Sequence, residues 1–206
     1  MPTTHLRFAE LRRGFGRLRV LAAVSGAVKS GEVLLVTGRN GSGKSTLLRC
    51  LAGLLAPESG RIELEDGGRS LDAAARRRAV GYVAPDLALY EELTCEENLL
   101  FFARVRRQPP ERGPELLDRV GLPPGRLYGA LSSGMRQRLR WAWALLHRPA
   151  VLLLDEPFQN LDAPGEALAR DLLAEHLRDG LAVVASPADL ELPRVATRLH
   201  LDDLTG

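Results

Sequence analysis

The feature that most constrains the fold is a glycine-rich loop that joins an apolar run to a helical one. The loop reads Gly38-Arg39-Asn40-Gly41-Ser42-Gly43-Lys44-Ser45-Thr46, with the apolar residues 33–36 before it and the periodic residues 47–51 after it. The three glycines let the backbone curl so that successive N–H groups point inward, and the following helix adds the positive end of its dipole. The pattern predicts a phosphate-binding loop between a buried strand and a helix.

Two side chains of this loop carry the expected chemistry. Lys44 is expected to reach the outer phosphates as a point charge, and the Ser45 hydroxyl is expected to hold a magnesium ion that bridges them. The alternative is an ordinary glycine-rich turn, but the strand before and the helix after are the context that the motif requires. Among the 28 lysines and arginines only Lys29 and Lys44 are lysines. This rarity indicates that position 44 requires the compact ammonium group of a lysine. The loop therefore predicts binding of a nucleoside triphosphate with Mg²⁺.

Length and composition exclude several classes of protein. A chain of 206 residues favours one domain, with or without an insertion, over two independent domains. The net charge of +2 comes from arginines interleaved with acidic residues, so no concentrated basic face and no nucleic-acid partner is expected. Cys50 and Cys95 have neither disulfide nor metal-ligand spacing and are expected to be free thiols. No signal peptide and no run of about 18 apolar residues is present, which predicts a cytoplasmic protein.

The remaining pattern predicts an α/β fold with a helical insertion. Residues 6–11, 20–28 and 32–37 are expected to form a short antiparallel sheet, and a helix is expected to run from the loop to about residue 55. Further strands are expected at 61–65, 80–83, 151–154, 181–186 and 198–201, and helices at 71–78, 95–107, 111–120, 134–147 and 165–176. We expect one domain, with a mixed-sheet core at 1–84 and 149–206 and a helical lobe at 85–148.

The aromatic residue Phe15 lies in a predicted turn and has two readings. A lone surface aromatic is usually uninformative. Alternatively, its ring is a stacking platform for a nucleotide base, which any purine face would satisfy. The sequence leaves both open.

The start of the helix at 134–147 also has two readings. Ser132 and Ser133 stand where N-cap residues are found, before Gly134, and a capped helix start is the ordinary explanation. The same arrangement of free N–H groups binds anions. Farther along, Met135, Leu139, Ala142 and Leu146 fall on one face and are expected to pack in the core.

Two carboxylates end the apolar run at 151–154. Such a run is typical of a strand buried on both faces, and open α/β sheets bind ligands at the carboxyl ends of their strands. Asp155 is expected to hold magnesium, and Glu156 to polarise the water that attacks the γ-phosphate. The alternative is a helix-capping turn before Pro157.

The four histidines are expected to lie away from this chemistry. None of His5, His147, His176 and His200 is expected at a strand end that faces the site, and each is expected to be a surface or filler residue.

Taken together, the chain resembles the ATP-binding-cassette (ABC) family over almost its whole length. Three markers occur in the family's order: the loop at 38–46, the signature-like Leu131-Ser132-Ser133-Gly134-Met135-Arg136-Gln137-Arg138, and Asp155-Glu156-Pro157. The resemblance implies two ATPase subunits, identical or different, that face each other head to tail. It also implies that the segment 132–134 contacts the γ-phosphate of ATP held by the other subunit, and that residues 160–162 form the loop that connects the two sites.

The resemblance also implies a membrane-spanning transporter subunit as partner, because this chain has no spanning segment of its own. That subunit is expected to dock around residues 87–93 and to hold the chain at the inner face of the membrane. Residues 89–94 and 97–99 and the Ser-Ser-Gly-Met form of the signature look most like the haem-exporter ATPase of cytochrome c maturation.

The chain departs from the family pattern in three places. In the signature, Ser133 and Met135 replace a glycine and a glutamine. Pro85 stands where a glutamine is expected, with Asp86 as the nearest oxygen ligand, and Pro187 replaces an expected histidine. Because proline has neither a side-chain donor nor an N–H, these losses weaken hydrolysis more than binding. The sequence therefore favours a transport ATPase, with a regulatory subunit that hydrolyses little as the second hypothesis. An ATPase unconnected with membranes is the third.

Overall fold

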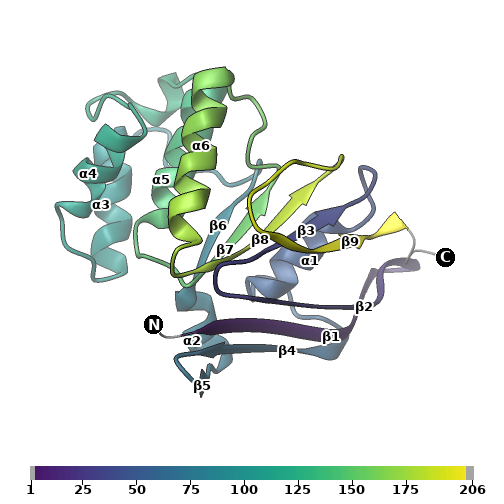
Figure 1. The fold of residues 1–206 in the computed structure, drawn as a ribbon. Coiled ribbons are helices and arrows are strands. Elements are labelled where there is room, and N and C mark those ends of the chain that lie inside the picture. Colours follow the sequence, from purple (N-terminus) through teal and green to yellow (C-terminus); the bar gives the residue numbers. More distant parts are fainter. Residues whose placement is uncertain (1–2, 203–206) are drawn as a thin grey trace.

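The computed structural model describes residues 3–202 as two sheets with helices packed on them, which confirms the predicted α/β fold (Figure 1). A five-stranded parallel sheet has the order β6 (Val80–Val83), β7 (Val151–Asp155), β8 (Leu181–Ser186), β3 (Val33–Thr37), β9 (Val195–His200). A four-stranded antiparallel sheet has the order β2 (Leu18–Lys29), β1 (Thr4–Phe15), β4 (Ser59–Asp66), β5 (Arg69–Ser70). The strands thus form two separate sheets, one with parallel pairs throughout and one with antiparallel pairs throughout.

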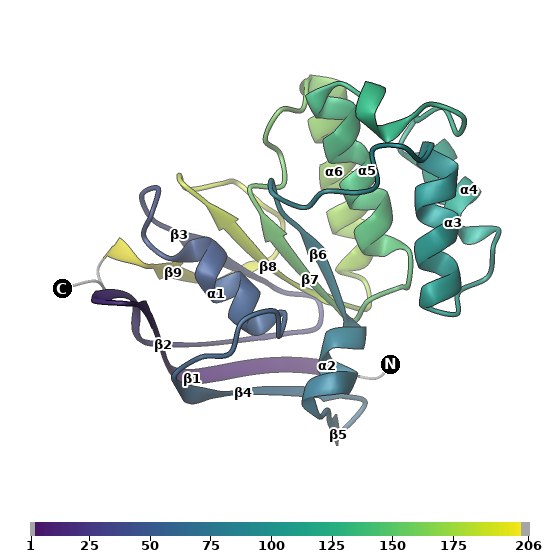
Figure 2. The same ribbon diagram turned by 180° about the vertical axis from the view of Figure 1, so that it is seen from behind.

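The helices cover both faces of the parallel sheet. They are α1 (Lys44–Leu51), α2 (Ala73–Ala79), α3 (Cys95–Val105), α4 (Arg112–Arg119), α5 (Ser133–Leu145) and α6 (Ala163–His176), with a 3₁₀ turn at Tyr128–Ala130. Helix α1 lies between the two sheets, and α5 and α6 lie on the opposite face of the parallel sheet (Figures 1 and 2). The parallel strands are therefore enclosed on both sides.

The side chains of β3 show how this arrangement forms two cores. Leu34 and Val36 point toward α1 and the antiparallel sheet, whereas Val33 and Leu35 point toward α3–α6. All four side chains are fully buried. A continuous apolar run is thus the expected sequence for a strand in a parallel sheet with helices on both faces.

The prediction that residues 32–37 join the antiparallel sheet was wrong. Strand β3 pairs with β8 and β9 in the parallel sheet, and β4 takes its place beside β1. The physical reason is that the antiparallel sheet buries one face only, so its strands alternate in burial, whereas the first four residues of β3 are all apolar and all buried.

Several predicted boundaries shift because of local backbone geometry. Helix α1 ends at Leu51 and not near residue 55, since Gly53 adopts a left-handed φ of 72° and the Leu54 N–H donates to the Arg49 carbonyl. Helix α2 begins at Ala73, where the Asp72 carboxylate accepts from the Ala75 N–H and caps the helix. The last strand starts three residues earlier than predicted, at Val195.

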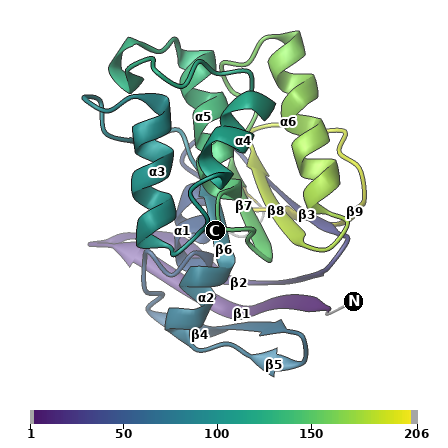
Figure 3. The ribbon, with the colours of Figure 1, turned by 90° about the vertical axis from the view of Figure 1, so that its left-hand side faces the viewer.

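Helices α3 and α4 stand apart from the parallel sheet, with α5 and α6 between (Figure 3). Helix α5 contacts α3 and α4 and also β6, and the predicted core residues Leu139, Ala142 and Leu146 are fully buried. The division of the chain into a core and a lobe at residues 85 and 148 stays a prediction. Among residues 3–202, no helix has the length and apolar character needed to cross a bilayer.

The buried imidazole of His147 gives a pH-dependent prediction. Burial and the nearby Arg106 lower the pKa of His147 from 6.5 to about 4. The hydrogen bond between Nε2 and the Val80 carbonyl raises it, but by less. Between these two values the unfolded chain takes up a proton at this residue and the folded chain does not. The free energy of unfolding therefore falls by up to about 1.4 kcal/mol per pH unit as the pH drops from 6.5 toward 4. Urea unfolding across this range should show a shallower pH slope in His147→Gln than in the unmodified chain, and parallel slopes would contradict this assignment.

Candidate active site

The predicted phosphate-binding loop connects β3 to α1 and has the curled backbone that an anion site needs. Gly38, Gly41 and Gly43 all have positive φ values, of 148°, 86° and 99°. At Gly43 a Cβ atom would lie 2.9 Å from the backbone oxygen of Val20 on β2, so only glycine allows this approach. The Ser42 N–H donates to the Arg39 carbonyl and closes the turn, and the first N–H groups of α1 beyond it have no helical acceptor.

Lys44 folds back across the loop. Its side chain is buried, and Nζ donates to the carbonyl oxygens of Gly38 at 2.6 Å and Arg39 at 2.9 Å. An ammonium has three donors, so one is left for a phosphate oxygen. The hydroxyl of Ser42 is also buried, and within residues 3–202 it has no hydrogen-bond partner. A buried hydroxyl and a loop of inward N–H groups fit a bound phosphate, since each gains the partner that the protein does not supply.

Asp155 ends β7 beside the loop. Its carboxyl is 4% exposed, and burial raises its pKa, while the hydrogen-bonded Ser45 hydroxyl acts in the opposite direction. Glu156 and Asp86 raise the pKa of Asp155 further, and Lys44 lowers it. A buried carboxyl beside other carboxylates and a hydroxyl favours a divalent cation.

Glu156 lines the same cavity as the phosphate-binding loop. The cavity holds about 320 Å³ and is lined by Val20, Asn40, Gly41, Gly43, Lys44, Ser45, Thr46 and Glu156. The Glu156 backbone has a left-handed φ of 48°, and its N–H continues the β7–β8 ladder to the Ala185 carbonyl. The Gln159 Nε2 donates to Oε2 of Glu156 at 3.0 Å and orients the carboxylate. The predicted base and the predicted phosphate site are thus in one cavity, although they lie more than a hundred residues apart in the sequence.

The structure adds a contact that the sequence analysis missed. Strand β9 runs beside β3, so that His200 Nδ1 lies 2.9 Å from the Thr37 hydroxyl, and Asp202 accepts from the Arg39 N–H at 3.0 and 3.2 Å. His200 is exposed and lines neither cavity at the loop, which agrees with the expectation that it is a surface residue. Because this contact depends on the register of two strands far apart in the chain, no local sequence signal could have revealed it.

Phe15 lies at the end of β1 and is half exposed, with the Arg13 guanidinium 5.0 Å from the ring centroid. Neither the phosphate-loop cavity nor the adjacent cavity of about 290 Å³, which Arg39 and Asn40 line, includes Phe15 among its lining residues. Stacking of a base on this ring stays a prediction.

The signature segment lies outside this cavity. The Ser132 hydroxyl accepts from the Met135 N–H at 3.3 Å and caps α5, and Ser132 and Ser133 are exposed. A Cβ on Gly134 would come within 2.8 Å of the Asn160 carbonyl, so glycine allows the start of α5 to touch the loop before α6. The structure does not bring residues 132–134 together with the loop at 38–46 in one subunit.

Pro85 and Pro187 follow the carboxyl ends of two strands of the parallel sheet, β6 and β8. Pro85 begins the turn after β6, where the Leu87 N–H donates to the Ala84 carbonyl, and the next residue, Asp86, pairs with Arg49 of α1. Pro187 follows β8 and is exposed. Since β8 lies between β7 and β3, Pro187 stands between the strand that carries Asp155 and the strand that carries the phosphate-binding loop.

Comparison with known proteins agrees with this site. The family described as ABC transporter matches residues 21–159. The chain is 40% identical over 173 residues to the cytochrome c biogenesis ATP-binding export protein CcmA of Rhizobium meliloti, covering 79% of this chain and 81% of that protein. It is 41% identical over 172 residues to the Fe(3+) ions import ATP-binding protein FbpC 1 of Rhodococcus jostii, covering 80% of this chain. The chain spans about half the length of that import relative.

Comparison with solved structures also identifies the fold. An ATP-binding subunit of an ABC transporter aligns with a TM-score of 0.78 and 29% identity, over 88% of this chain and 78% of that one. The ATP-binding cassette MJ0796, solved as a dimer in a post-hydrolysis state bound to ADP and Pi, aligns with a TM-score of 0.78 and 25% identity, over 89% and 88%. From the curled loop, the carboxylates at the end of β7 and these matches, we conclude that the chain belongs to the ABC transporter family and has its ATPase fold.

Proposed function

We propose that the chain is the motor subunit of an ABC exporter, which binds and hydrolyses Mg-ATP to drive transport through a separate membrane subunit. The observation that carries the proposal is the cavity in which the loop at 41–46 and Glu156 converge, and in which the lining residue Ser45 is hydrogen-bonded to Asp155. Lys44 and the loop N–H groups would hold the phosphates, and Ser45 and Asp155 would hold Mg²⁺. The ion would neutralise charge that develops on the phosphates.

Glu156 is the proposed catalytic base. Its carboxylate is positioned by Gln159 and faces the loop cavity, where it can orient a water toward the γ-phosphate. In this proposal the segment 132–134 of a second ATPase subunit closes over the same ATP, because within one subunit these residues lie outside the cavity. Phe15 is the proposed platform for the base.

The proposed docking site for the membrane subunit is the loop at 87–93 with α3. Tyr90 and Phe101 are both partly exposed, and their ring centroids lie 5.3 Å apart. The loop is held in place by the buried Asn98, whose side chain accepts from the Tyr90 N–H and donates to three loop carbonyls. Exposed aromatic side chains on a fixed backbone are typical of a protein interface. Through this partner the chain would sit at the cytoplasmic face of the membrane.

Haem export for cytochrome c biogenesis is the proposed transport function. Its support is the match to CcmA, which spans most of both chains, together with the Ser-Ser-Gly-Met form of the signature. Relatives named for iron and sulfate import have similar identity, but the chain covers only about half of their length.

A regulatory subunit is the second candidate, because Pro85 and Pro187 remove two polar side chains from the ends of strands that border the site. Such a subunit would bind ATP and lend its signature segment to an active partner.

The pairing is tested by the mass of the protein in solution. Light scattering of Glu156→Gln with ATP and magnesium should show twice the mass that it shows without nucleotide, since slow hydrolysis keeps the ATP between two copies. Adding Ser133→Glu, which places a carboxylate against the γ-phosphate, should return the mass to that of one chain, whereas Ser133→Ala should not. If ATP binds and the mass stays that of one chain in Glu156→Gln, pairing of identical subunits is wrong and a different second subunit is required.

A further inference from the structure

A second cavity, remote from the phosphate-binding loop, gathers arginines from separate elements. It holds about 710 Å³ and is lined by Ala74, Arg77, Arg78, Val105, Arg106, Arg107, Gln108 and His147. We call it the arginine cavity. Figures 2 and 3 show α2 next to one end of α3, and the loop that follows α5 completes the wall. The expectation that arginines stay interleaved with acids was wrong here, because none of the lining residues is acidic.

Local structure explains why the arginines point into this space. Arg77 and Arg78 lie in the last turn of α2, where positive charge is favoured by the helix dipole. The left-handed Gly53 allows the end of α1 to pack against Arg77, and a Cβ there would come within 2.9 Å of the Arg77 Cγ. Arg107 follows α3 with a left-handed φ of 54°. A position near a helix end explains each arginine by itself. It does not explain why arginines from separate elements line one cavity.

The arginine cavity has an acidic neighbour at longer range in Asp72, whose pKa is lowered by the backbone hydrogen bond from Ala75 and also by the charges of Arg78 and Arg77. Across residues 3–202, no ion pair within 4.0 Å forms at Arg77, Arg78, Arg106 or Arg107. Burial lowers the pKa of Arg106, whose guanidinium lies 5.6 Å from the centre of the Trp143 ring. Clustered cations are costly unless an anion joins them.

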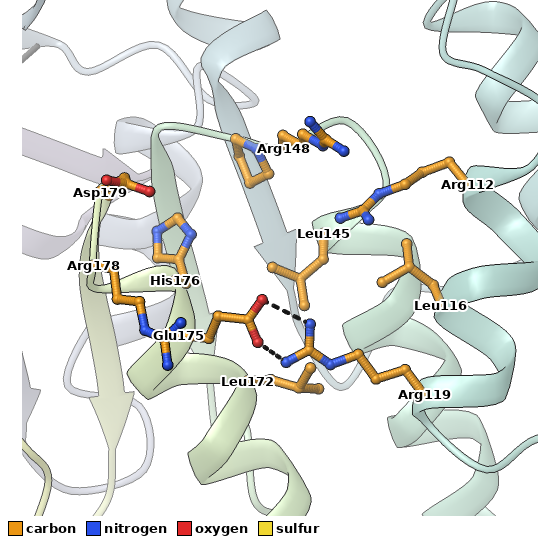
Figure 4. Close-up of a pocket in the computed structure, with 12 residues that line it drawn as sticks. Arg112, Leu116, Arg119, Leu145, Arg148, Leu172, Glu175, His176, Arg178 and Asp179 are labelled. Carbon is orange, nitrogen blue, oxygen red and sulfur yellow. Dashed lines mark hydrogen bonds and ion pairs between the residues drawn. The ribbon is translucent and has the colours of Figure 1, made fainter. Parts of the chain in front are cut away.

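A second cavity lined by arginines differs from the arginine cavity because acidic side chains also line it (Figure 4). It holds about 370 Å³ and lies between α4 and α6, with Arg112, Arg119, Arg148 and Arg178 in its wall beside Glu175 and Asp179. Arg119 and Glu175 form a two-pronged ion pair, which lowers the pKa of Glu175. Acidic side chains stand in the wall of this cavity and are absent from the lining of the arginine cavity, so the two cavities can be compared.

We propose that the arginine cavity binds a phosphate ester group. Planar guanidinium groups match phosphate oxygens with paired hydrogen bonds, and four of them surround the space here. A single bounded cavity, without a basic stripe leading from it, favours one phosphate group over a nucleic-acid backbone. The exposed apolar Val105 lines the cavity, and Phe101 lies one helical turn away on α3. This combination of cations and apolar side chains favours the headgroup of an anionic phospholipid as the source, with a soluble phosphate compound as the other source.

The test uses vesicles and a soluble probe, without nucleotide. Sedimentation with phosphatidylglycerol vesicles should bind the purified chain, and phosphatidylcholine vesicles should not. Arg78→Ser/Arg107→Ser should weaken binding about tenfold or more, because two charge-assisted contacts are lost. The control Arg148→Ser/Arg178→Ser removes the same charge from the cavity that also contains Glu175 and Asp179, and it should change binding by less than about twofold. All four side chains are exposed, and thermal unfolding checks that each variant is folded.

The soluble probe is inorganic pyrophosphate, titrated by calorimetry into Lys44→Ala so that the phosphate-binding loop does not compete. Binding of pyrophosphate that Arg78→Ser/Arg107→Ser removes, with no preference between the vesicles, supports the phosphate site and assigns it to a soluble compound. Equal losses in the two double variants would overturn the proposal, because net charge alone would then explain binding. Absence of binding to both probes would overturn it as well. None of these outcomes depends on ATP hydrolysis, so they leave the proposed function untouched.

Discussion

Lys44→Ala should lower the affinity for Mg-ATP by about 10²-fold or more. Lys44 Nζ is buried in the loop, where it is held by the carbonyl oxygens of Gly38 and Arg39 and keeps one donor for the phosphates. Loss of a charge-assisted contact in a desolvated site costs about 1.5–3 kcal/mol, and 2.7 kcal/mol corresponds to 10²-fold. Equilibrium titration with a fluorescent ATP analogue measures the change.

The matched control is Lys29→Ala, which removes the only other lysine. Lys29 is exposed and pairs with Glu32 at the turn before β3, so its loss should leave the affinity within about twofold. If Lys44→Ala and Lys29→Ala bind the analogue equally well, the loop does not hold the phosphates.

Pro187→His should raise the rate of phosphate release from ATP by about 10²-fold. Pro187 follows β8, where Ala185 pairs with Asp155 of β7 and Ser186 pairs with Thr37 of β3. Position 187 thus lies between the strand that carries the proposed magnesium ligand Asp155 and the strand that leads into the phosphate-binding loop, and proline offers no donor there. One donor aimed at developing charge is worth about 10²- to 10³-fold in rate.

The control for this gain is Pro187→Ala, which relaxes the backbone in the same way but adds no donor. The affinity for ATP should be unchanged in both variants, because the loop is intact. A rate in Pro187→His no higher than in Pro187→Ala would show that the lack of a donor at position 187 does not limit hydrolysis, and attention would move to Pro85.

A structural feature could be predicted from the sequence when the residues that specify it lie close together in the chain. The phosphate-binding loop, the cap at Ser132 and the buried run before Asp155 are encoded within a few residues, so their local structure was predictable. The place of β3 was not, because an apolar strand fits either sheet until its partners are known. The hydrogen bonds of His200 with Thr37 and of Asp202 with Arg39 depend on the pairing of β9 with β3, and the arginine cavity depends on where α2 lies relative to the end of α3. Both features bring together segments that lie far apart in the chain, and no sequence pattern links those segments.

The most direct test of the proposed motor is phosphate release by the purified chain with ATP and magnesium, beside Glu156→Gln. We expect slow but measurable turnover in the unmodified chain, and a fall of about 10²-fold or more in Glu156→Gln, because the base is lost while the phosphate-binding loop and Asp155 remain. ATP bound by both proteins with no turnover in either would contradict hydrolysis by this chain. That result would leave it as a nucleotide-binding subunit that needs an active partner.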